Sequence, residues 1–506
     1  MFRIRILSAW VIMTMLFSAC ADWVNVSPKD EIEADKLFKS ENGFKVALIG
    51  VYSRMTLLDN YGKRLSYDYI ERLAQRYDNY DISVAPSDKT RAEIYDYKNN
   101  ANAKEDVNSV WVNQFGTIAN LNNLLYRLEH EGKDVVLTDG YWNLMKGEAL
   151  GLRAFHYFDL LRLYGPVYSE DPEMKCLPWR TEFNADQKSL ESAGVIAQHI
   201  LEDLTQAEEL LKDDPLNYKN DLNNPFLGLR KHRMNKMAVK ALMARVYLWI
   251  GDKENAALKA KEVIEQCGLE LVISNIQDAS LYDETIFCLG MDDMANKLKD
   301  DWKSINTYSN ELYISYDNAN TVFERTTIGL NDIRYRNSYG FIHGNNGLMC
   351  RKYLSKDKNY SEKIPLIRLS EMYYILAESV SLKESVTYIN KVRNARGISR
   401  NNNIEANDSY DEAARKEALN KEYQKDFFAE GQYVRFRNTV ILTAGFGKAH
   451  IFLGFKFTED HRRLYESSLS LMLDQIPLCT KLLHCTSDSD PADLVKLCKL
   501  RLCRDF

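Results

Sequence analysis

The 506-residue sequence has no excess of basic residues. Its 66 Lys and Arg residues are outnumbered by 72 Asp and Glu residues, which gives a formal net charge of −6. A protein that binds nucleic acid needs a concentrated basic surface to neutralise phosphates, and the chain shows no basic stripe. The sequence therefore argues against nucleic acid as a partner.

Anchored catalytic motifs are also missing. The chain contains no HExxH, GxSxG or Walker A loop, and Gly445-Phe446-Gly447 lacks the third glycine of GxGxxG. A glycoside hydrolase needs only a pair of carboxylates and stays open as an alternative, although such enzymes more often adopt barrels or sandwiches than helical hairpins. We predict a protein that is not an enzyme and has no cofactor.

The nine cysteines form no CxxC pair and no regular spacing. A disulfide framework is therefore not indicated, and we predict no metal site. Four of the nine lie within the last 28 residues, and that clustering marks the C-terminus as unusual.

An export signal opens the chain. Arg3 and Arg5 form a positive end, residues 6–17 are an apolar stretch, and Ser18-Ala19 are small. The apolar stretch is shorter than the roughly 20 residues of a spanning helix, so a retained signal anchor is the weaker alternative. We predict that residues 1–19 are a signal peptide.

Leu16-Phe17-Ser18-Ala19-Cys20 resembles the bacterial lipobox, although Leu is usual where Phe17 stands. The resemblance implies that Cys20 is acylated, for example with palmitate, and becomes the first mature residue. Acyl chains contribute about 0.8 kcal/mol per buried methylene, so several together anchor a protein to a membrane. The polar residues 20–40 are then a tether.

Residues 41–436 contain no Gly/Ser-rich or Pro-rich linker and are expected to form one domain dominated by helical periodicity. The 34 residues from Met234 to Cys267 carry two apolar stripes separated by Gly251-Asp252, with small Ala positions that let two helices approach closely. This length and pattern predict a tetratricopeptide-like hairpin.

Two further hairpins are expected. One helix is predicted to begin after Pro365, with a partner that ends near Gly397. In the other hairpin, a helix through Leu150–Leu161 is expected to pair with a helix in residues 107–128. The apolar positions of the helix after Pro365 are Leu366, Leu369, Tyr373, Leu376 and Val380.

Long segments without clear periodicity separate these hairpins, chiefly residues 61–106, 168–186 and 277–353. Their Tyr, Trp, Asn and Asp content favours folded loops over disorder. The predicted fold is mainly α, with tetratricopeptide-like hairpins stacked as a right-handed superhelix that carries a loop-rich irregular lobe.

Three blocks of sequence resemble the SusD/RagB family of outer-membrane nutrient-binding lipoproteins. They are the Arg153 to Val167 block with its Leu-Tyr-Gly-Pro-Val ending, the Ile364 to Glu378 block followed by Asn390-Lys391-Val392-Arg393, and Glu422 to Gln432 with its Glu-Gly. We expect Arg368, Glu371 and Glu378 to support helix packing. The pair Asp332 and Arg334 resembles a family Asp-x-Arg element, which we interpret as structural.

The resemblance implies a lipoprotein of the cell outer membrane that binds a glycan or a related oligomer. It also implies a partner, a SusC-like TonB-dependent transporter over which the protein sits as a lid. A tetratricopeptide-like adaptor for other proteins is the remaining alternative, but an adaptor would not need the export signal or the long aromatic loops.

Sugar sites combine an aromatic platform with amides, carboxylates or Arg that bond to hydroxyls. Two loop segments have this composition. The candidate ligand-binding residues are Arg76, Tyr77, Asn79, Tyr80 and Tyr95 in the first segment, and Trp302, Tyr308 and Tyr313 in the second, where Tyr316 follows.

Residues 437–506 form an atypical tail, in which the Pro-Leu-Pro-Asp turn expected near the end of the family is missing. One interpretation is a divergent metal-binding tail built on Cys479, His484, Cys485, Cys498 and Cys503, but its spacings fit no standard zinc pattern. The other is a frameshift, because codons shifted by two bases across residues 466–475 permit Val-Phe-Pro-Leu-Pro-Asp-Ala-Gly.

Overall fold

The computed structural model describes residues 34–433 apart from 79–100, 185, 220–222, 274–277, 299–311, 336–339, 344–346, 351 and 354–359. Most of the described chain is helical. The α-helices are α2 (Ala34–Leu37), α3 (Glu41–Met55), α4 (Tyr69–Leu73), α6 (Ala101–Arg127), α7 (Lys133–Val135), α8 (Tyr141–Tyr164), α9 (Ala193–Leu210), α10 (Lys236–Ile250), α11 (Lys253–Gln266), α12 (Met294–Lys297), α13 (Tyr316–Phe323), α14 (Leu369–Ser379), α15 (Leu382–Ala395) and α16 (Glu412–Asp426).

Short antiparallel sheets complete the described fold. Strand β1 pairs with β2, β3 pairs with β7, and a three-stranded sheet has the order β4-β6-β5. The strands are β1 (Lys175–Pro178), β2 (Leu190–Ser192), β3 (Thr285–Gly290), β4 (Tyr313–Ile314), β5 (Phe341–His343), β6 (Leu348–Cys350) and β7 (Lys363–Arg368).

The hairpin predicted from Met234 to Cys267 is present as α10 and α11. The Asn235 side chain caps α10 by accepting hydrogen bonds from the backbone N–H groups of Met237 and Ala238, both at 2.9 Å. Gly251 ends the helix with φ +88°, a conformation that disfavours residues with a Cβ. Small residues then pack the two helices together, since Ala241, Ala244, Ala256 and Ala260 are fully buried.

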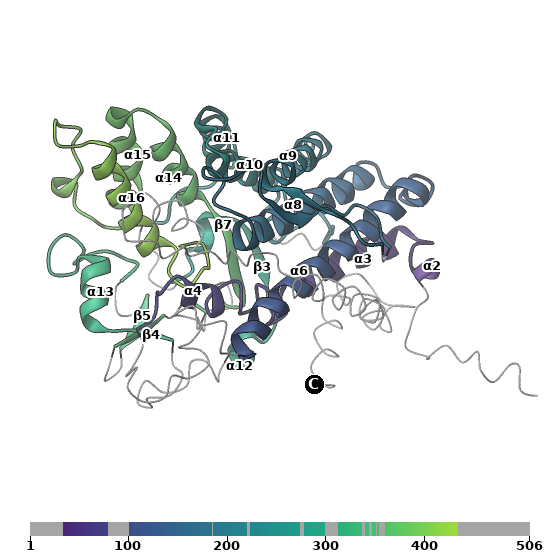
Figure 1. Cartoon of the computed structure of the whole chain (residues 1–506), viewed down its shortest axis with the longest axis horizontal. Helices are drawn as coiled ribbons and strands as arrows, with labels where there is room; N and C mark the ends of the chain where they lie inside the picture. Colours follow the sequence, from purple (N-terminus) through teal and green to yellow (C-terminus); the bar gives the residue numbers. More distant parts are fainter. Residues whose placement is uncertain are drawn as a thin grey trace, which may run out of the picture.

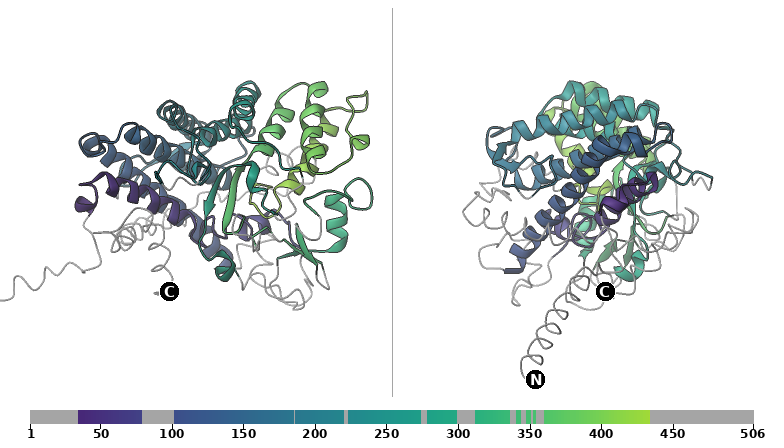
Figure 2. Two further views of the ribbon diagram at one scale, coloured as in Figure 1. Left: turned by 180° about the vertical axis from the view of Figure 1, so that it is seen from behind. Right: turned by 90° about the vertical axis from the view of Figure 1, so that its right-hand side faces the viewer.

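Helices α6, α8, α9, α10, α11, α14 and α15 pack side by side as a continuous layer. Helix α8 contacts both α6 and α9, α10 contacts α9 and α11, and α14 joins α11 to α15. Figure 1 and its reverse view in Figure 2 show α8 to α11, α14 and α15 on one side of the molecule, with α13, β4 and β5 on the other. The prediction of a mainly helical, tetratricopeptide-like architecture is confirmed.

The predicted start of the helix, directly after Pro365, was wrong. Residues Lys363–Arg368 form strand β7, which pairs with β3 in the register Leu289↔Ile364 and Phe287↔Ile367, and α14 begins only at Leu369. The continuous apolar run around Pro365 suits a buried strand as well as a helix. The proline, which has no N–H to donate, lies beside the register shifts of this sheet.

The segment 277–353 is also more regular than expected. It contributes β3, α12, β4, α13, β5 and β6. Phe323 and Phe341 are buried and form an edge-to-face pair with centroids 5.3 Å apart, and Phe341 in turn packs on Phe428. These rings belong to the same apolar core as the buried residues of the helical layer.

A buried ionic cluster joins this lobe to the helices. Arg396 after α15 bonds to Glu284 at 2.6 and 2.8 Å and to Asp426 of α16 at 3.0 Å. Arg368 at the end of β7 bonds to Glu284 at 2.9 Å and to Glu430 at 3.0 Å. Because all five side chains are almost fully buried, each charge depends on its partners for solvation.

Of the other residues assigned to packing, Asp332, Arg334 and Glu371 are buried in ion pairs, whereas Glu378 Oε2 is buried without a hydrogen-bond partner among the described residues. Arg334 is buried between Asp332 at 2.6 Å and Glu422 at 2.9 Å. Glu371 bonds to Arg245 at 2.6 Å. Burial raises the pKa of the Glu422 carboxyl, but Arg334 and its neighbouring cations outweigh burial and lower that pKa to about 2.

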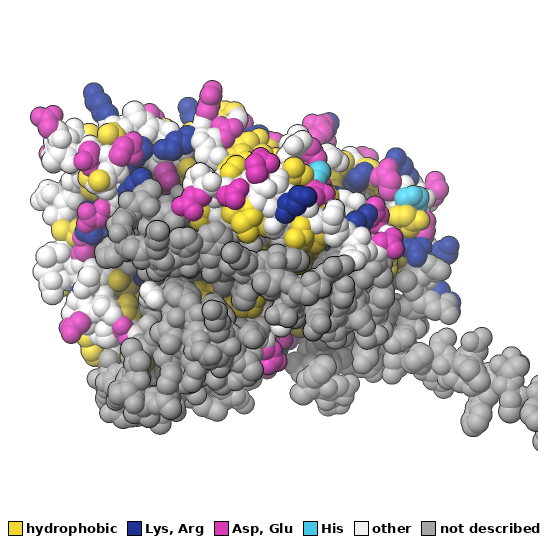
Figure 3. Space-filling view, in the orientation of Figure 1, with side chains coloured by type: hydrophobic (Ala, Val, Ile, Leu, Met, Phe, Trp, Pro, Cys, Tyr) yellow, Lys and Arg dark blue, Asp and Glu magenta, His cyan; other side chains and the backbone are white. Residues whose placement is uncertain are grey.

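Within the described ranges, every helix is too short or too polar to cross a membrane. Cys176, Cys267, Cys288 and Cys350 are buried free thiols. On the described part of the face in Figure 3, basic and acidic side chains are interspersed, in agreement with the balanced composition.

Candidate functional site

Arg76 and Tyr77, in the first predicted ligand-binding segment, pack against residues near the end of the described chain. Arg76 donates to the side chain and backbone oxygens of Gln424 at 2.9 and 2.8 Å, and its guanidinium lies over the rings of Phe428 and Tyr433. Such contacts between cations and rings add to the hydrogen bonds. Arg76 is only 6% exposed, so its guanidinium does not face solvent.

Tyr77 packs against the same region as Arg76. Its hydroxyl donates to the backbone oxygen of Tyr67 at 2.6 Å, and its ring packs edge-to-face on Phe428. The side chain is 5% exposed. In this conformation Tyr77 offers no open face on which a sugar ring can stack.

Glu71 of α4 connects this region to the chain that follows α16. Its carboxylate accepts the backbone N–H groups of Ala429 at 3.1 Å and Gly431 at 2.8 Å. Burial raises the pKa of Glu71 to about 7, although Arg76 and the two N–H groups act in the opposite direction. The two hydrogen bonds hold the Ala429–Gly431 turn, in which these residues have φ +62° and +68°, against α4.

Asp78 joins the two predicted ligand-binding segments. Its backbone N–H donates to the Tyr313 oxygen at 2.9 Å. Its carboxylate accepts from the Ser315 N–H and from the Asn318 side-chain amide. Residue 78 is the last described residue before 79–100, and Leu312 is the first after 299–311. Two segments more than 230 positions apart in the chain therefore meet at one carboxylate.

Tyr313 and Tyr316 lie next to this junction. Tyr313 is half-buried in β4, where it pairs with Met349. Tyr316 opens α13, and its ring lies 5.8 Å from the ring of His343 with its hydroxyl 3.4 Å from His343 Nδ1. Ser315 caps α13 by accepting the Asn318 N–H at 3.2 Å. The described junction thus combines partly exposed rings, a carboxylate and an amide.

Sequence reasoning did not single out Ser315, Asn318 or His343. Ser315 gives a weak signal as a possible helix cap before α13, whereas no local pattern connects Asn318 or His343 to residue 78. Several predicted residues lie outside the described ranges. They are Cys20, Asn79, Tyr80, Tyr95, Trp302 and Tyr308.

The described residues contain no group of three or more His, Cys, Asp or Glu side chains suited to a metal ion. The junction instead presents the groups that recognise a neutral polar ligand, namely flat rings for stacking and planar acceptors and donors for hydroxyls.

Comparison with family models identifies the family to which this combination of helical hairpins and a loop-rich lobe belongs. A family described as starch-binding and associating with the outer membrane matches residues 31–248, and the SusD family itself matches residues 245–438. The chain belongs to the SusD/RagB family. Among curated protein sequences, none matches the chain significantly.

Solved structures share the fold at low sequence identity. A SusD superfamily protein from Bacteroides thetaiotaomicron is 18% identical with a TM-score of 0.63, over 85% of this chain and 94% of that one. A putative sugar-binding protein from Bacteroides vulgatus is 21% identical with a TM-score of 0.62, over 79% and 87%. A laminarin-binding SusD-like protein is 16% identical with a TM-score of 0.56, over 82% and 95%.

Proposed function

We propose that the protein is a glycan-binding lipoprotein of the cell outer membrane whose ligand stacks on aromatic rings of the lobe. The observation that carries the proposal is the junction at Asp78, because it brings together the ends of the two segments rich in aromatic and amide side chains. Membership of the SusD/RagB family and the sugar-binding and laminarin-binding names of fold relatives support the ligand class.

The residues proposed to contact the glycan are Tyr313 at the junction and Asn79, Tyr80, Tyr95, Trp302 and Tyr308 in the adjoining segments. Rings supply the stacking platform, and amides bond to hydroxyls without requiring charge on the ligand. Arg76 and Tyr77 are assigned a positioning role, since their buried contacts fix the residue that precedes the loop.

The proposed cell biology follows from the family and from the N-terminus. Acylated Cys20 anchors the protein, the residues between Cys20 and α2 tether it, and a SusC-like TonB-dependent transporter receives the ligand. The predicted tether of residues 20–40 is too long, because Leu37 and Phe38 are buried in the core of the domain. The lid arrangement over the transporter needs a binding surface and no chemistry on the glycan, so the protein acts as a binder and not as an enzyme.

A glycan array tests this proposal, with the purified protein and a version in which the C-terminal reading frame is restored. We expect binding to one class of oligosaccharide, and no new reducing ends when that oligosaccharide is incubated with the protein. Release of reducing ends would establish the glycoside hydrolase instead. Absence of binding to every glycan by the frame-restored protein, together with capture of soluble proteins, would favour the adaptor.

A further inference from the structure

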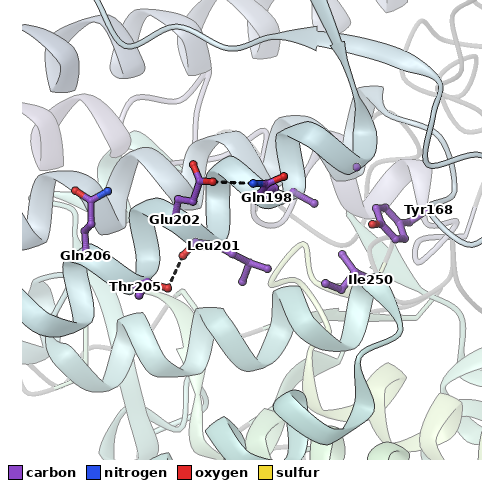
Figure 4. Close-up of a pocket in the computed structure, with 9 residues that line it drawn as sticks. Tyr168, Gln198, Leu201, Glu202, Thr205, Gln206 and Ile250 are labelled. Atoms are coloured by element: carbon purple, nitrogen blue, oxygen red, sulfur yellow. Dashed lines mark hydrogen bonds between the residues drawn. The ribbon is translucent and has the colours of Figure 1, made fainter.

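A groove of about 680 Å³ lies on the helical layer, on elements other than those of the lobe. Helix α9 forms one side of the groove, and Ile250 at the end of α10 lies with Tyr168, from the segment after α8, at one end of it (Figure 4). Leu201 and Ile250 are partly exposed and give the groove an apolar part. The volume falls in the range of small-molecule sites.

Polar side chains follow the groove at regular intervals. Gln198, Glu202 and Gln206 are exposed and spaced four residues apart on α9, so each lies about 6 Å further along the same helix face. Gln198 donates to Glu202 at 2.9 Å, which orders these two groups. This row offers alternating amides and a carboxylate at intervals similar to the length of one pyranose ring.

Tyr168 supplies a ring at the end of this row, with packed aromatic support. Its ring lies 5.1 Å from that of Trp249, which packs edge-to-face on the buried Phe158 at 5.7 Å. The Tyr168 side chain is half-buried, so part of it faces the groove. A supported ring next to amides is the combination that binds sugars.

The charge of the groove selects against acidic ligands. Its lining includes Glu202 and no Lys or Arg. Hydrogen bonds from His199 and Gln198 lower the pKa of Glu202, so this carboxylate is anionic at neutral pH. Repulsion disfavours uronic acids and sulfated sugars, whereas a neutral glycan can donate its hydroxyls to the carboxylate.

We propose that this groove is a second binding site, for a neutral polysaccharide chain, separate from the site in the lobe. A long chain that occupies both sites gains avidity, whereas a short oligosaccharide fills one site at a time. The groove therefore makes affinity depend on chain length.

Affinity electrophoresis in gels that contain laminarin, starch, xylan or galactomannan tests the proposal. The variant is Gln198→Ala/Gln206→Ala, in which both side chains are exposed, and the matched control is Glu209→Ala, an exposed residue of α9 outside the groove lining. Loss of two hydrogen bonds should weaken retardation by the preferred polysaccharide about tenfold. The control should migrate as wild type does. The affinity of the double variant for a disaccharide or trisaccharide of the same sugar should remain within about twofold of the wild-type affinity.

A double variant retarded as strongly as wild type by every polysaccharide overturns the second site, and so does a wild type that none of the four retards. A lobe variant, Trp302→Ala/Tyr308→Ala, separates the two proposals. If it is retarded as wild type while the groove variant is not, the groove stands and the lobe assignment fails. Tyr168→Ala, with its thermal melting recorded, should reproduce the groove defect.

Discussion

Removing Arg396 should destabilise the protein strongly, because its guanidinium is the centre of the buried ionic cluster. Arg396 is fully buried and bonds to two carboxylates, Glu284 and Asp426, and to the backbone oxygen of Val272 at 3.0 Å. In Arg396→Met the side chain keeps a similar length but loses its charge. Both carboxylates then stay buried with fewer partners.

Breaking a buried ion pair by removal of one partner typically costs about 3–5 kcal/mol. We expect about 3 kcal/mol for Arg396→Met, at the lower end, because Arg368 still pairs with Glu284 at 2.9 Å and lies 3.6 Å from Asp426. A loss of this size is a large fraction of the 5–15 kcal/mol typical of a folded domain.

Urea unfolding followed by circular dichroism measures this loss. Arg400→Met is the matched control, because Arg400 is an exposed arginine four positions along the chain. Its free energy of unfolding should stay within about 0.5 kcal/mol of wild type. A destabilisation below about 1 kcal/mol for Arg396→Met, or an equal effect of both variants, would refute the role assigned to the cluster.

Three further outcomes are expected. Burial lowers the pKa of His156 to about 3, so its imidazole stays neutral in the folded protein but takes up a proton below about pH 6.5 in the unfolded chain. The free energy of unfolding should therefore fall as the pH is lowered from 6.5 to 3. Urea titrations at several pH values should show a smaller fall for His156→Gln. Asp78→Ala should weaken glycan binding about tenfold in calorimetry without changing the far-ultraviolet spectrum, and an unchanged affinity would contradict the junction's role. Mass spectrometry of the exported protein should show residues 1–19 removed and Cys20 acylated; an exported chain with an unmodified Cys20 would exclude the anchor.

The helical layer was predictable because its information is local. The turn at Gly251-Asp252 and the alanine stripes on both sides specify a hairpin without reference to any other part of the chain. Strand β7 was not predictable in the same way, because Ile364-Pro365-Leu366-Ile367 is apolar at every position and its pairing with β3 depends on residues more than 70 positions away. The ionic cluster depends on similarly distant partners, such as Glu284 and Arg396.

The candidate site was predictable in composition and not in detail. The sequence indicates that rings and amides gather in two long segments, and the junction at Asp78 brings the ends of these segments together. Which rings are open to ligand depends on tertiary packing. Arg76 and Tyr77 have the right chemistry for a sugar site. They are buried, however, by Gln424 of α16 and by Phe428 in the turn that follows this helix.

Calorimetric titration of the preferred array glycan into three proteins tests the central claim most directly. They are wild type, Trp302→Ala/Tyr308→Ala, and Tyr126→Ala, whose exposed ring on α6 stacks on His130 away from the lobe. Each stacking ring contributes about 0.5–1.5 kcal/mol beyond buried area, so the double variant should bind at least tenfold more weakly. The Tyr126 variant should bind as wild type. Wild-type affinity in the double variant would contradict glycan binding by the lobe.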